Sequence, residues 1–317
     1  MLLFIAGLGD TFSTVPYVPD LAVALPAWRV CHVQLSSSGK GWGMASLDED
    51  CEEIGIAVNW AREQFKLAAG DGKVDIVLIG HSTGCQDVLH YLHTSPSSPR
   101  PAVQGAILQA PVSDREAMLN SIAKNPAKKA IYEHCMTFAN SLDEDEQKDM
   151  IIPIPWSQEI YFDRTPLSVS RFLSLTSPGS PAKPEPDDLF SSDATKAWLE
   201  ATFGKLGKSE AFAISSSSAH GKPNMLIAMM GADEAVPEHV DTDILLLRWK
   251  KAIEKDGTAV LDEASGVVAG GKHNLRGKDG DRKKARDDFV EMVSAYLGRV
   301  VGKSEGEVTS LPIRQSL

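Results

Sequence analysis

The sequence predicts an α/β fold in which helices cover both faces of a mostly parallel central sheet. Six short runs rich in aliphatic residues predict the strands, and each run is apolar at consecutive positions. Strands that are buried on both faces show such continuous runs, whereas half-exposed strands alternate. Helical patterns separate the runs, and this alternation is typical of doubly wound α/β proteins. The predicted strands cover 2–7, 30–35, 74–80, 105–110, 224–231 and 265–270.

Three helices between or after these strands have the clearest patterns. The first starts at Ser46, because Ser46 and Glu49 have the spacing of a capping box. Its apolar residues recur at helical spacing, which predicts one buried face made of Ile54, Val58, Ala61 and Phe65. The second helix follows Ser82, and the third covers about 283–299.

A long segment interrupts the alternation between the fourth and fifth strands. It opens with a second capping-box pattern, from Ser113 to Glu116, and continues with helical patterns to about residue 149. The Pro-rich and aromatic stretch 151–166 is expected to be irregular, and the low-complexity stretch 177–188 is expected to be a mobile loop. We therefore predict four parts: the first part of the core at 1–112, an inserted lid at 113–223, the second part of the core at 224–302, and a flexible tail at 303–317.

Composition excludes several classes of function. The formal net charge of −11 provides no basic field for a nucleic acid partner. No apolar run approaches the roughly 18 residues that a membrane span needs. The four cysteines are scattered without a CxxC pair, so neither a zinc site nor a disulfide framework is indicated.

The apolar start "MLLFIAGLGD" predicts a buried strand and not a signal peptide, because no basic residues precede the apolar run. With no targeting segment, we expect a cytoplasmic protein in a reducing compartment. The sequence leaves the oligomeric state open.

Gly80-His81-Ser82-Thr83-Gly84 lies between a predicted strand and a predicted helix. A GxSxG sequence in this context is a nucleophile elbow, the turn that presents the serine hydroxyl above the sheet in the α/β-hydrolase fold. Side chains two positions before and after the serine would collide, so both positions favour glycine. The alternative is a glycine- and serine-rich turn without chemistry. We expect the α/β-hydrolase fold with Ser82 as the nucleophile.

A serine nucleophile needs a base and an acid, and in this fold they follow the serine in the order acid, histidine. His273 comes directly after the last predicted strand, in a glycine-flanked loop, and is the expected base. Asp233 follows the second-last strand in "MMGADEAVP" and is the expected acid, with Glu234 as the fallback and Asp241 and Asp243 as remoter choices. The alternative for each is an ordinary surface loop residue.

The oxyanion that forms during acyl transfer needs two hydrogen-bond donors. One is the backbone N–H of Thr83, the residue after the nucleophile. The other should come from the loop after an early strand, where Gly7-Leu8-Gly9 gives the backbone freedom to turn an amide inward. Leu8 is the expected donor and Gly9 the next candidate, and a plain glycine turn is the alternative. Gly9 is also a candidate for contact with the substrate.

Several longer stretches resemble the fungal siderophore esterases of the fusarinine C type and their α/β-hydrolase relatives: "GLGD", "SSSGKGWGMASLDEDCEEI", "GHSTGCQDVLHYL", "GAILQAPVSDRE", "SRFLSLTSP", "DDLFSSD" and "GADEAVP". The resemblance covers most of the chain and implies hydrolysis of ester bonds in a hydroxamate siderophore, with release of iron inside the cell. The family's nucleophile, acid and histidine would fall on Ser82, Asp233 and His273. Its members usually carry one or two strands ahead of the strand that starts here at Leu2. Either the sheet lacks these N-terminal strands at one edge, or the sequence is a truncated version.

Substrate contacts are less clearly indicated. Asp114 and Arg115 follow a strand at the same sheet edge as Ser82 and are candidates, although a solvated first helical turn explains them equally well. Gln86 is a further candidate, whereas Asp87 is explained by its place in the first turn of a helix. Trp156 is the candidate aromatic pocket residue, together with Tyr161, Phe162 and Phe172, and ordinary packing in the lid is the alternative.

These residues predict a serine esterase that acts on a small-molecule ester, in the family's case an iron–siderophore complex, through an acyl-enzyme. No metal or organic cofactor is required, and any iron would arrive with the substrate. Two alternatives remain: a carboxylesterase, lipase or thioesterase for another acyl group, or a hydrolase-fold module that binds a ligand without turnover.

Overall fold

The computed structural model describes residues 1–69, 74–96, 98–161, 164–277 and 279–301. Its described strands form one sheet in the spatial order β2-β1-β3-β4-β5, with β6 and β7 both paired to β5, and every pairing is parallel. All six predicted strands are present, and only β6, two residues long, had no signal in the sequence. The strands are β1 (Leu2–Ile5), β2 (Val30–Val33), β3 (Val77–His81), β4 (Gly105–Gln109), β5 (Asn224–Met230), β6 (Val260–Leu261) and β7 (Gly266–Val268).

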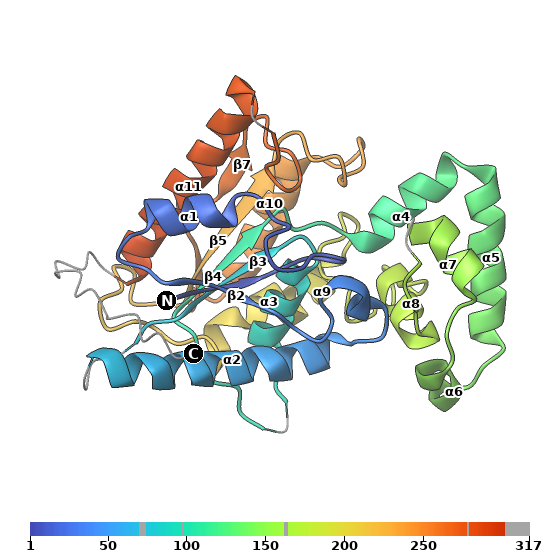
Figure 1. Ribbon diagram of the computed structural model, residues 1–317, viewed down its shortest axis with the longest axis horizontal. Helices are drawn as coiled ribbons and strands as arrows, with labels where there is room; N and C mark the ends of the chain where they lie inside the picture. The colour runs from blue at the N-terminus through green and yellow to red at the C-terminus, as the bar shows by residue number, and fades with distance from the viewer. Residues whose placement is uncertain (70–73, 97, 162–163, 278, 302–317) are drawn as a thin grey trace, which may run out of the picture.

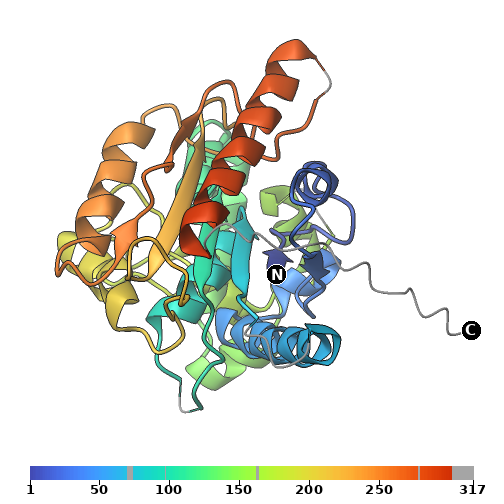
Figure 2. The same cartoon turned by 90° about the vertical axis from the view of Figure 1, so that its left-hand side faces the viewer.

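Helices cover both faces of this sheet, as the continuous apolar runs predicted (Figures 1 and 2). One face carries α1 (Val18–Ala24) and α11 (Gly280–Val300). The other carries α2 (Leu47–Ala69), α3 (Gly84–His93), α9 (Lys196–Ala201), the 3-10 helix η2 (Phe203–Lys208) and α10 (Thr242–Ile253). Large side chains such as Phe289 on the first face and Trp249 on the second are fully buried, and each such burial contributes about 1.5–3 kcal/mol.

Residues 114–161 and 164–176 form a separate group of helices, called here the helical body, at one end of the molecule (Figure 1). It has an apolar core of its own, centred on buried residues such as Cys135 and Phe172. Its helices are α4 (Asp114–Ala123), α5 (Pro126–Asn140), α6 (Glu144–Asp149), α7 (Ile154–Tyr161) and α8 (Val169–Thr176).

The helix α7 corrects the expectation that 151–166 is irregular. Pro153 precedes the helix and Pro155 lies in its first turn, where a missing N–H costs nothing because that donor has no partner inside a helix. The carbonyl of Pro153 accepts the first hydrogen bonds, from the N–H groups of Trp156 and Ser157. Both prolines are therefore compatible with a helix that begins at Ile154.

The remainder of the predicted lid differs from the helical body. α9 and η2 contribute Leu199, Phe203 and Leu206 to the apolar core on the sheet face that α2, α3 and α10 cover. The stretch 177–188 contains no helix or strand, but its hydrogen bonds argue against a mobile loop: Ser177 Oγ accepts from the N–H of Glu185, and the Asp187 carboxylate is buried. The lid boundaries at 113 and 223 remain a prediction, and the tail at 303–317 lies outside the described residues.

The two predicted capping boxes have different outcomes. At Ser46 the box is complete, since the hydroxyl accepts from the N–H of Glu49 and the Glu49 carboxylate accepts from the N–H of Ser46. At Ser113 the hydroxyl accepts from the N–H of Glu116, but the Glu116 carboxylate binds Ser192 instead. The second box is therefore half formed, and its glutamate ties α4 to the segment before α9.

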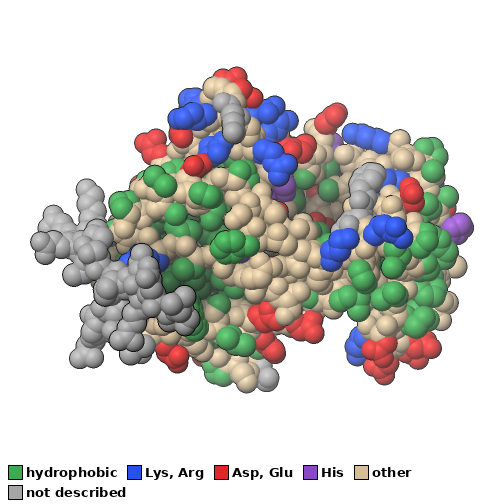
Figure 3. Space-filling view, in the orientation of Figure 1, with side chains coloured by type: hydrophobic (Ala, Val, Ile, Leu, Met, Phe, Trp, Pro, Cys, Tyr) green, Lys and Arg blue, Asp and Glu red, His purple; other side chains and the backbone are tan. Residues whose placement is uncertain are grey.

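Surface charges of both signs are interspersed on the face shown in Figure 3, and acidic side chains gather at the tip of the helical body, where α6 lies. Within the described residues, no helix is both long enough and apolar enough to cross a bilayer.

Candidate active site

Ser82 occupies the sharp turn between β3 and α3. Its φ of 54° lies in the left-handed region, which is strained for a residue with a side chain. The neighbouring glycines make the turn feasible: a Cβ on Gly80 would collide with the backbone of Gly84, and one on Gly84 would lie 2.5 Å from the carbonyl oxygen of Ile5. The sequence predicted this elbow for this steric reason.

His273 and Asp233 meet Ser82 at the carboxyl ends of the strands. The Nε2 atom of His273 lies 2.7 Å from Ser82 Oγ, and Nδ1 lies 2.9 and 3.0 Å from the two carboxylate oxygens of Asp233. Asp233 is itself held by the N–H of Ala235, which donates to its carboxylate. The carboxylate of the fallback acid, Glu234, accepts from the backbone N–H of His273.

Electrostatics favour a charged His273 ring in this setting. Burial alone would lower its pKa, because a charged imidazolium loses hydration in the interior. The hydrogen bond and the negative charge of Asp233 outweigh this effect, and the pKa of His273 is raised above the ordinary value of 6.5. The Asp233 side chain is only 1% exposed, so its charge is screened little by solvent.

The predicted oxyanion donors lie beside the nucleophile. A Cβ built on Gly7 would lie 2.8 Å from Ser82 Cβ and 3.3 Å from Ser82 Oγ, so the peptide group joining Gly7 to Leu8 passes close to the hydroxyl. Leu8 and Thr83 line one small cavity, and their backbone N–H groups have no acceptor among the described residues. Gly9 has a φ of 76° and open space around it, which fits a turn residue.

Gln109, at the end of β4, hydrogen-bonds the loop that carries His273. Its amide nitrogen donates to the backbone carbonyl of His273 at 2.9 Å, while its amide oxygen accepts from Tyr17 and lies 2.5 Å from Nδ1 of His81. The centroids of the His81 and His273 rings lie 5.1 Å apart. Burial lowers the pKa of His81 to about 3, so the His81 ring is neutral at neutral pH. Sequence reasoning missed Gln109, although a glutamine inside the apolar run "GAILQA" was a signal.

The weaker sequence candidates fall in different places. Asp114 lies next to the site, 3.5 Å from the Thr83 hydroxyl, and accepts from the amide of Gln86. Burial raises the pKa of Asp114 to about 6. Arg115 instead turns toward the segment before α9, where it pairs with Asp188 at 3.0 Å and with Asp193, so its position does not support a substrate contact.

The aromatic candidates belong to the packing of the helical body. Trp156 packs against the rings of His134 and Phe138, and Phe172 is fully buried in the same core. Tyr161 packs edge-on against Trp42, and Phe162 lies outside the described residues. These contacts favour the alternative that the sequence offered, ordinary packing.

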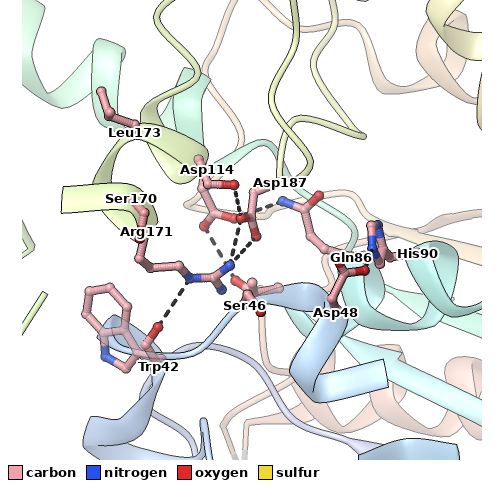
Figure 4. A network of polar contacts seen from close by, with 12 residues as sticks. Trp42, Ser46, Asp48, Gln86, His90, Asp114, Ser170, Arg171, Leu173 and Asp187 are labelled. Carbon is pink, nitrogen blue, oxygen red and sulfur yellow. Dashed lines mark hydrogen bonds and ion pairs between the residues drawn. The ribbon is translucent and has the colours of Figure 1, made fainter. Parts of the chain in front are cut away.

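A buried arginine that the sequence did not single out joins the helical body to the core beside the site. Arg171 extends from α8 toward the carboxylates of Asp114 and Asp187 (Figure 4). It donates to both carboxylate oxygens of Asp187, at 2.8 and 2.6 Å, and to the carbonyl of Trp42 in the 3-10 helix η1 (Gly39–Gly43). Because breaking such a buried pair costs about 3–5 kcal/mol, it holds α8 against the core.

Comparisons with known proteins identify the family of the chain. The family model described as "Protein of unknown function (DUF1749)" matches residues 1–298. Fusarinine C esterase sidJ of Aspergillus fumigatus is 38% identical over 95% of this chain and 89% of its own length, and esterase AN6793 of Emericella nidulans is 35% identical over 95% and 86%. The solved structure of siderophore hydrolase EstB from Aspergillus fumigatus matches with a TM-score of 0.82 and 38% identity, covering 95% of this chain and 91% of that one. The chain therefore belongs to this family, the fungal siderophore esterases, and has the α/β-hydrolase fold of a family of carboxylic ester hydrolases.

Proposed function

We propose that this chain is a serine esterase in which Ser82, His273 and Asp233 form the catalytic triad. The observation that carries the proposal is the continuous chain of hydrogen bonds from Asp233 through His273 to Ser82. It lies beside two backbone amides that have no acceptor in the described part of the chain. A serine hydroxyl is a poor nucleophile until a base takes its proton, and here the base and its partner are within hydrogen-bond distance.

The reaction has two steps. Ser82 Oγ attacks the ester carbonyl carbon while His273 Nε2 takes the hydroxyl proton, and the N–H groups of Leu8 and Thr83 stabilise the oxyanion. The oxyanion collapses to an acyl-enzyme as His273 gives that proton to the leaving alcohol. Water then attacks the acyl-enzyme with His273 again as base, which releases the carboxylic acid and restores Ser82. Asp233 holds the ring orientation and stabilises the imidazolium throughout.

We further propose that the substrate is an ester of a fusarinine-type hydroxamate siderophore, and that hydrolysis releases iron inside the cell. The names of two relatives, a fusarinine C esterase and a siderophore hydrolase, support this substrate class. All four cysteines are free thiols and three are buried, which suits a reducing compartment such as the cytoplasm. The triad requires no cofactor, and the iron is part of the substrate.

Mass spectrometry of the purified protein incubated with ferric fusarinine-type siderophores tests the substrate. We expect each cleaved ester bond to add the mass of one water, with no such products from the Ser82→Ala variant. Short 4-nitrophenyl esters, assayed in parallel, separate this substrate from the broader alternative. If the short esters are hydrolysed and the siderophores are not, the protein is an esterase for another acyl group.

The raised pKa of His273 predicts the pH dependence of the reaction. The base must be neutral to accept the proton from Ser82, so kcat/KM should fall as the pH drops through an apparent pKa above 6.5. In Asp233→Asn the largest of the contributions that raise the pKa of His273 is gone, so the acid limb should move to lower pH while the plateau falls about 10⁴-fold. Glu234→Gln is the control for the plateau, because the Glu234 carboxylate hydrogen-bonds only the backbone N–H of His273, and the plateau should stay within about tenfold of wild type. The charge of Glu234 also contributes to the raised pKa of His273, so the acid limb of this variant should move in the same direction as that of Asp233→Asn. An acid limb that is unchanged in Asp233→Asn contradicts the assignment of the acid.

Gly7→Ala tests the close approach of the oxyanion loop to the nucleophile. The added methyl group would lie 2.8 Å from Ser82 Cβ, so either the loop or the serine must move. Misplacement of about 1 Å can cost about 10²-fold, and we expect a loss in kcat of at least that size. Gly266→Ala is the matched control, since a Cβ there meets nothing within 4 Å. Normal turnover by Gly7→Ala would show that this loop does not supply an oxyanion donor.

A further inference from the structure

Gln109 contacts both the nucleophile and the base of the candidate triad. Its backbone carbonyl accepts from the N–H of Ser82 at 3.1 Å, and its side-chain amide donates to the backbone carbonyl of His273 at 2.9 Å. The residue is fully buried and lies at the carboxyl end of β4, the strand paired with β3. One residue therefore links the elbow that carries Ser82 to the loop that carries His273.

The amide group of Gln109 has one orientation that suits its neighbours. Its oxygen lies 2.9 Å from the hydroxyl oxygen of Tyr17 and 2.5 Å from Nδ1 of His81, so it can accept from both. A flipped amide would place this oxygen against the carbonyl oxygen of His273, and neither of these two atoms can donate. The two donors on the amide oxygen therefore keep the amide nitrogen directed at the histidine loop.

His81 has to carry its proton on Nδ1 to donate to Gln109, because the amide oxygen can only accept. A doubly protonated ring could also donate, but burial and the nearby His273 ring lower the pKa of His81 to about 3. Asp10, whose carboxylate lies 3.7 Å from Nε2, and Asp233 favour the charged ring but do not outweigh these two effects. A neutral His81 ring places no positive charge beside the imidazolium that forms on His273 during the reaction.

We propose that Gln109 and His81 are positioning residues for the catalytic base: the Nδ1–H group of His81 holds the Gln109 amide, and this amide holds the main chain of His273 and so sets the distance from its Nε2 atom to Ser82. Neither residue takes part in a chemical step. Placement matters because a shift of about 1 Å in a reacting group can cost about 10²-fold in rate. This inference rests on the proposed function, since a base has to be placed only if Ser82 is a nucleophile.

Gln109→Met tests the contact to His273. Methionine has a similar length and shape but no donor, so the carbonyl of His273 loses its amide partner. On 4-nitrophenyl butyrate we expect kcat to fall by at least about tenfold while KM stays within about threefold of wild type, because a displaced base slows the chemical step. A wild-type kcat in folded Gln109→Met would overturn the proposal.

Tyr296→Phe is the matched control, because it also removes buried hydrogen bonds from the sheet but at the opposite end of the strands. The Tyr296 hydroxyl donates to the carbonyl of Asn224 and accepts from the N–H of Ala106. This variant should unfold at a lower urea concentration while its kcat per folded molecule stays the same. If it loses as much kcat as Gln109→Met, both losses are a general effect of a weakened sheet and the positioning role is wrong.

His81→Asn and His81→Leu separate hydrogen bonding from packing. The amide nitrogen of asparagine takes nearly the place of Nδ1 and can donate to Gln109, whereas leucine fills similar space without a donor. We expect His81→Asn to keep kcat within about threefold of wild type and His81→Leu to lose at least about tenfold. Gln109→Met combined with His81→Leu should lose little beyond either change alone, because both break the same chain of contacts. Equal kcat values for the two His81 variants would contradict the proposal.

NMR of wild-type protein with isotope-labelled histidine tests the tautomer without a substitution at the site. Between about pH 5 and 8, the His81 ring should be neutral with its proton on Nδ1. The His81 signals are identified by their absence from His81→Asn. A proton found on Nε2 of the neutral ring would rule the proposal out, because such a ring cannot donate to Gln109.

Failure of this inference can be told apart from failure of the proposed function. If wild-type protein hydrolyses 4-nitrophenyl butyrate and folded Gln109→Met does so at the same rate, the esterase assignment stands and the positioning role is wrong. If wild-type protein hydrolyses no ester and Ser82 does not react with a fluorophosphonate, the esterase assignment itself is wrong.

Discussion

Replacing Ser82 with alanine is expected to lower kcat by about 10⁶-fold, because the acyl-enzyme can no longer form. Stability should change little. The side chain loses one hydrogen bond, to His273, and alanine keeps the small size that the elbow requires, so we expect a shift in the free energy of unfolding within about 1.5 kcal/mol. Initial rates on 4-nitrophenyl butyrate and urea denaturation of the same preparation measure the two effects.

Ser46→Ala is the matched control for this variant. Ser46 caps α2, so its loss should cost about 1 kcal/mol of stability while turnover per folded molecule stays the same. The two serines should thus show opposite effects. Turnover by Ser82→Ala above about one-hundredth of wild type would mean that another group attacks the ester.

His273→Ala is expected to be nearly as severe as Ser82→Ala, and the double variant should lose no more than a few-fold beyond either single variant. The two side chains act as one unit through their 2.7 Å contact, and removal of either leaves the other without a function. Steady-state kcat/KM for both single variants and the double variant measures the coupling.

His239→Ala is the control for general effects of removing a histidine near the acid turn. His239 is exposed and follows the same strand as Asp233, so its variant should keep wild-type turnover. Losses of Ser82→Ala and His273→Ala that simply multiply in the double variant would contradict a shared mechanism.

Much of the fold and the position of the candidate triad could be predicted, because both follow from local rules. The parallel sheet was visible in continuous apolar runs, and parallel strands bring their carboxyl ends to one edge. The glycines around Ser82 were required by the elbow, and chain order then pointed to Asp233 and His273. The structure places His273 Nε2 within hydrogen-bond distance of Ser82, 191 positions earlier in the chain.

The parts that could not be predicted depend on contacts between segments far apart in the sequence. Nothing local shows that Arg171 of α8 reaches Asp187, or that Cys51 of α2 contacts the carbonyl of Asp87, because both contacts arise from packing of separate elements. The helix α7 was missed because Pro155 lies in its first turn, the one part of a helix that accepts proline. The stretch 177–188 was judged by composition, which does not reveal its buried hydrogen bonds.

Reaction of the folded protein with a fluorophosphonate, followed by peptide mass spectrometry, tests the central claim most directly. Fluorophosphonates modify only a serine whose hydroxyl is activated by a neighbouring base, so the reaction reports on the nucleophile and on its partners together. We predict one adduct, on the peptide containing Ser82, that is absent from Ser82→Ala and strongly reduced in His273→Ala. An unmodified Ser82 in the folded protein, or an adduct on a different serine, would contradict the account.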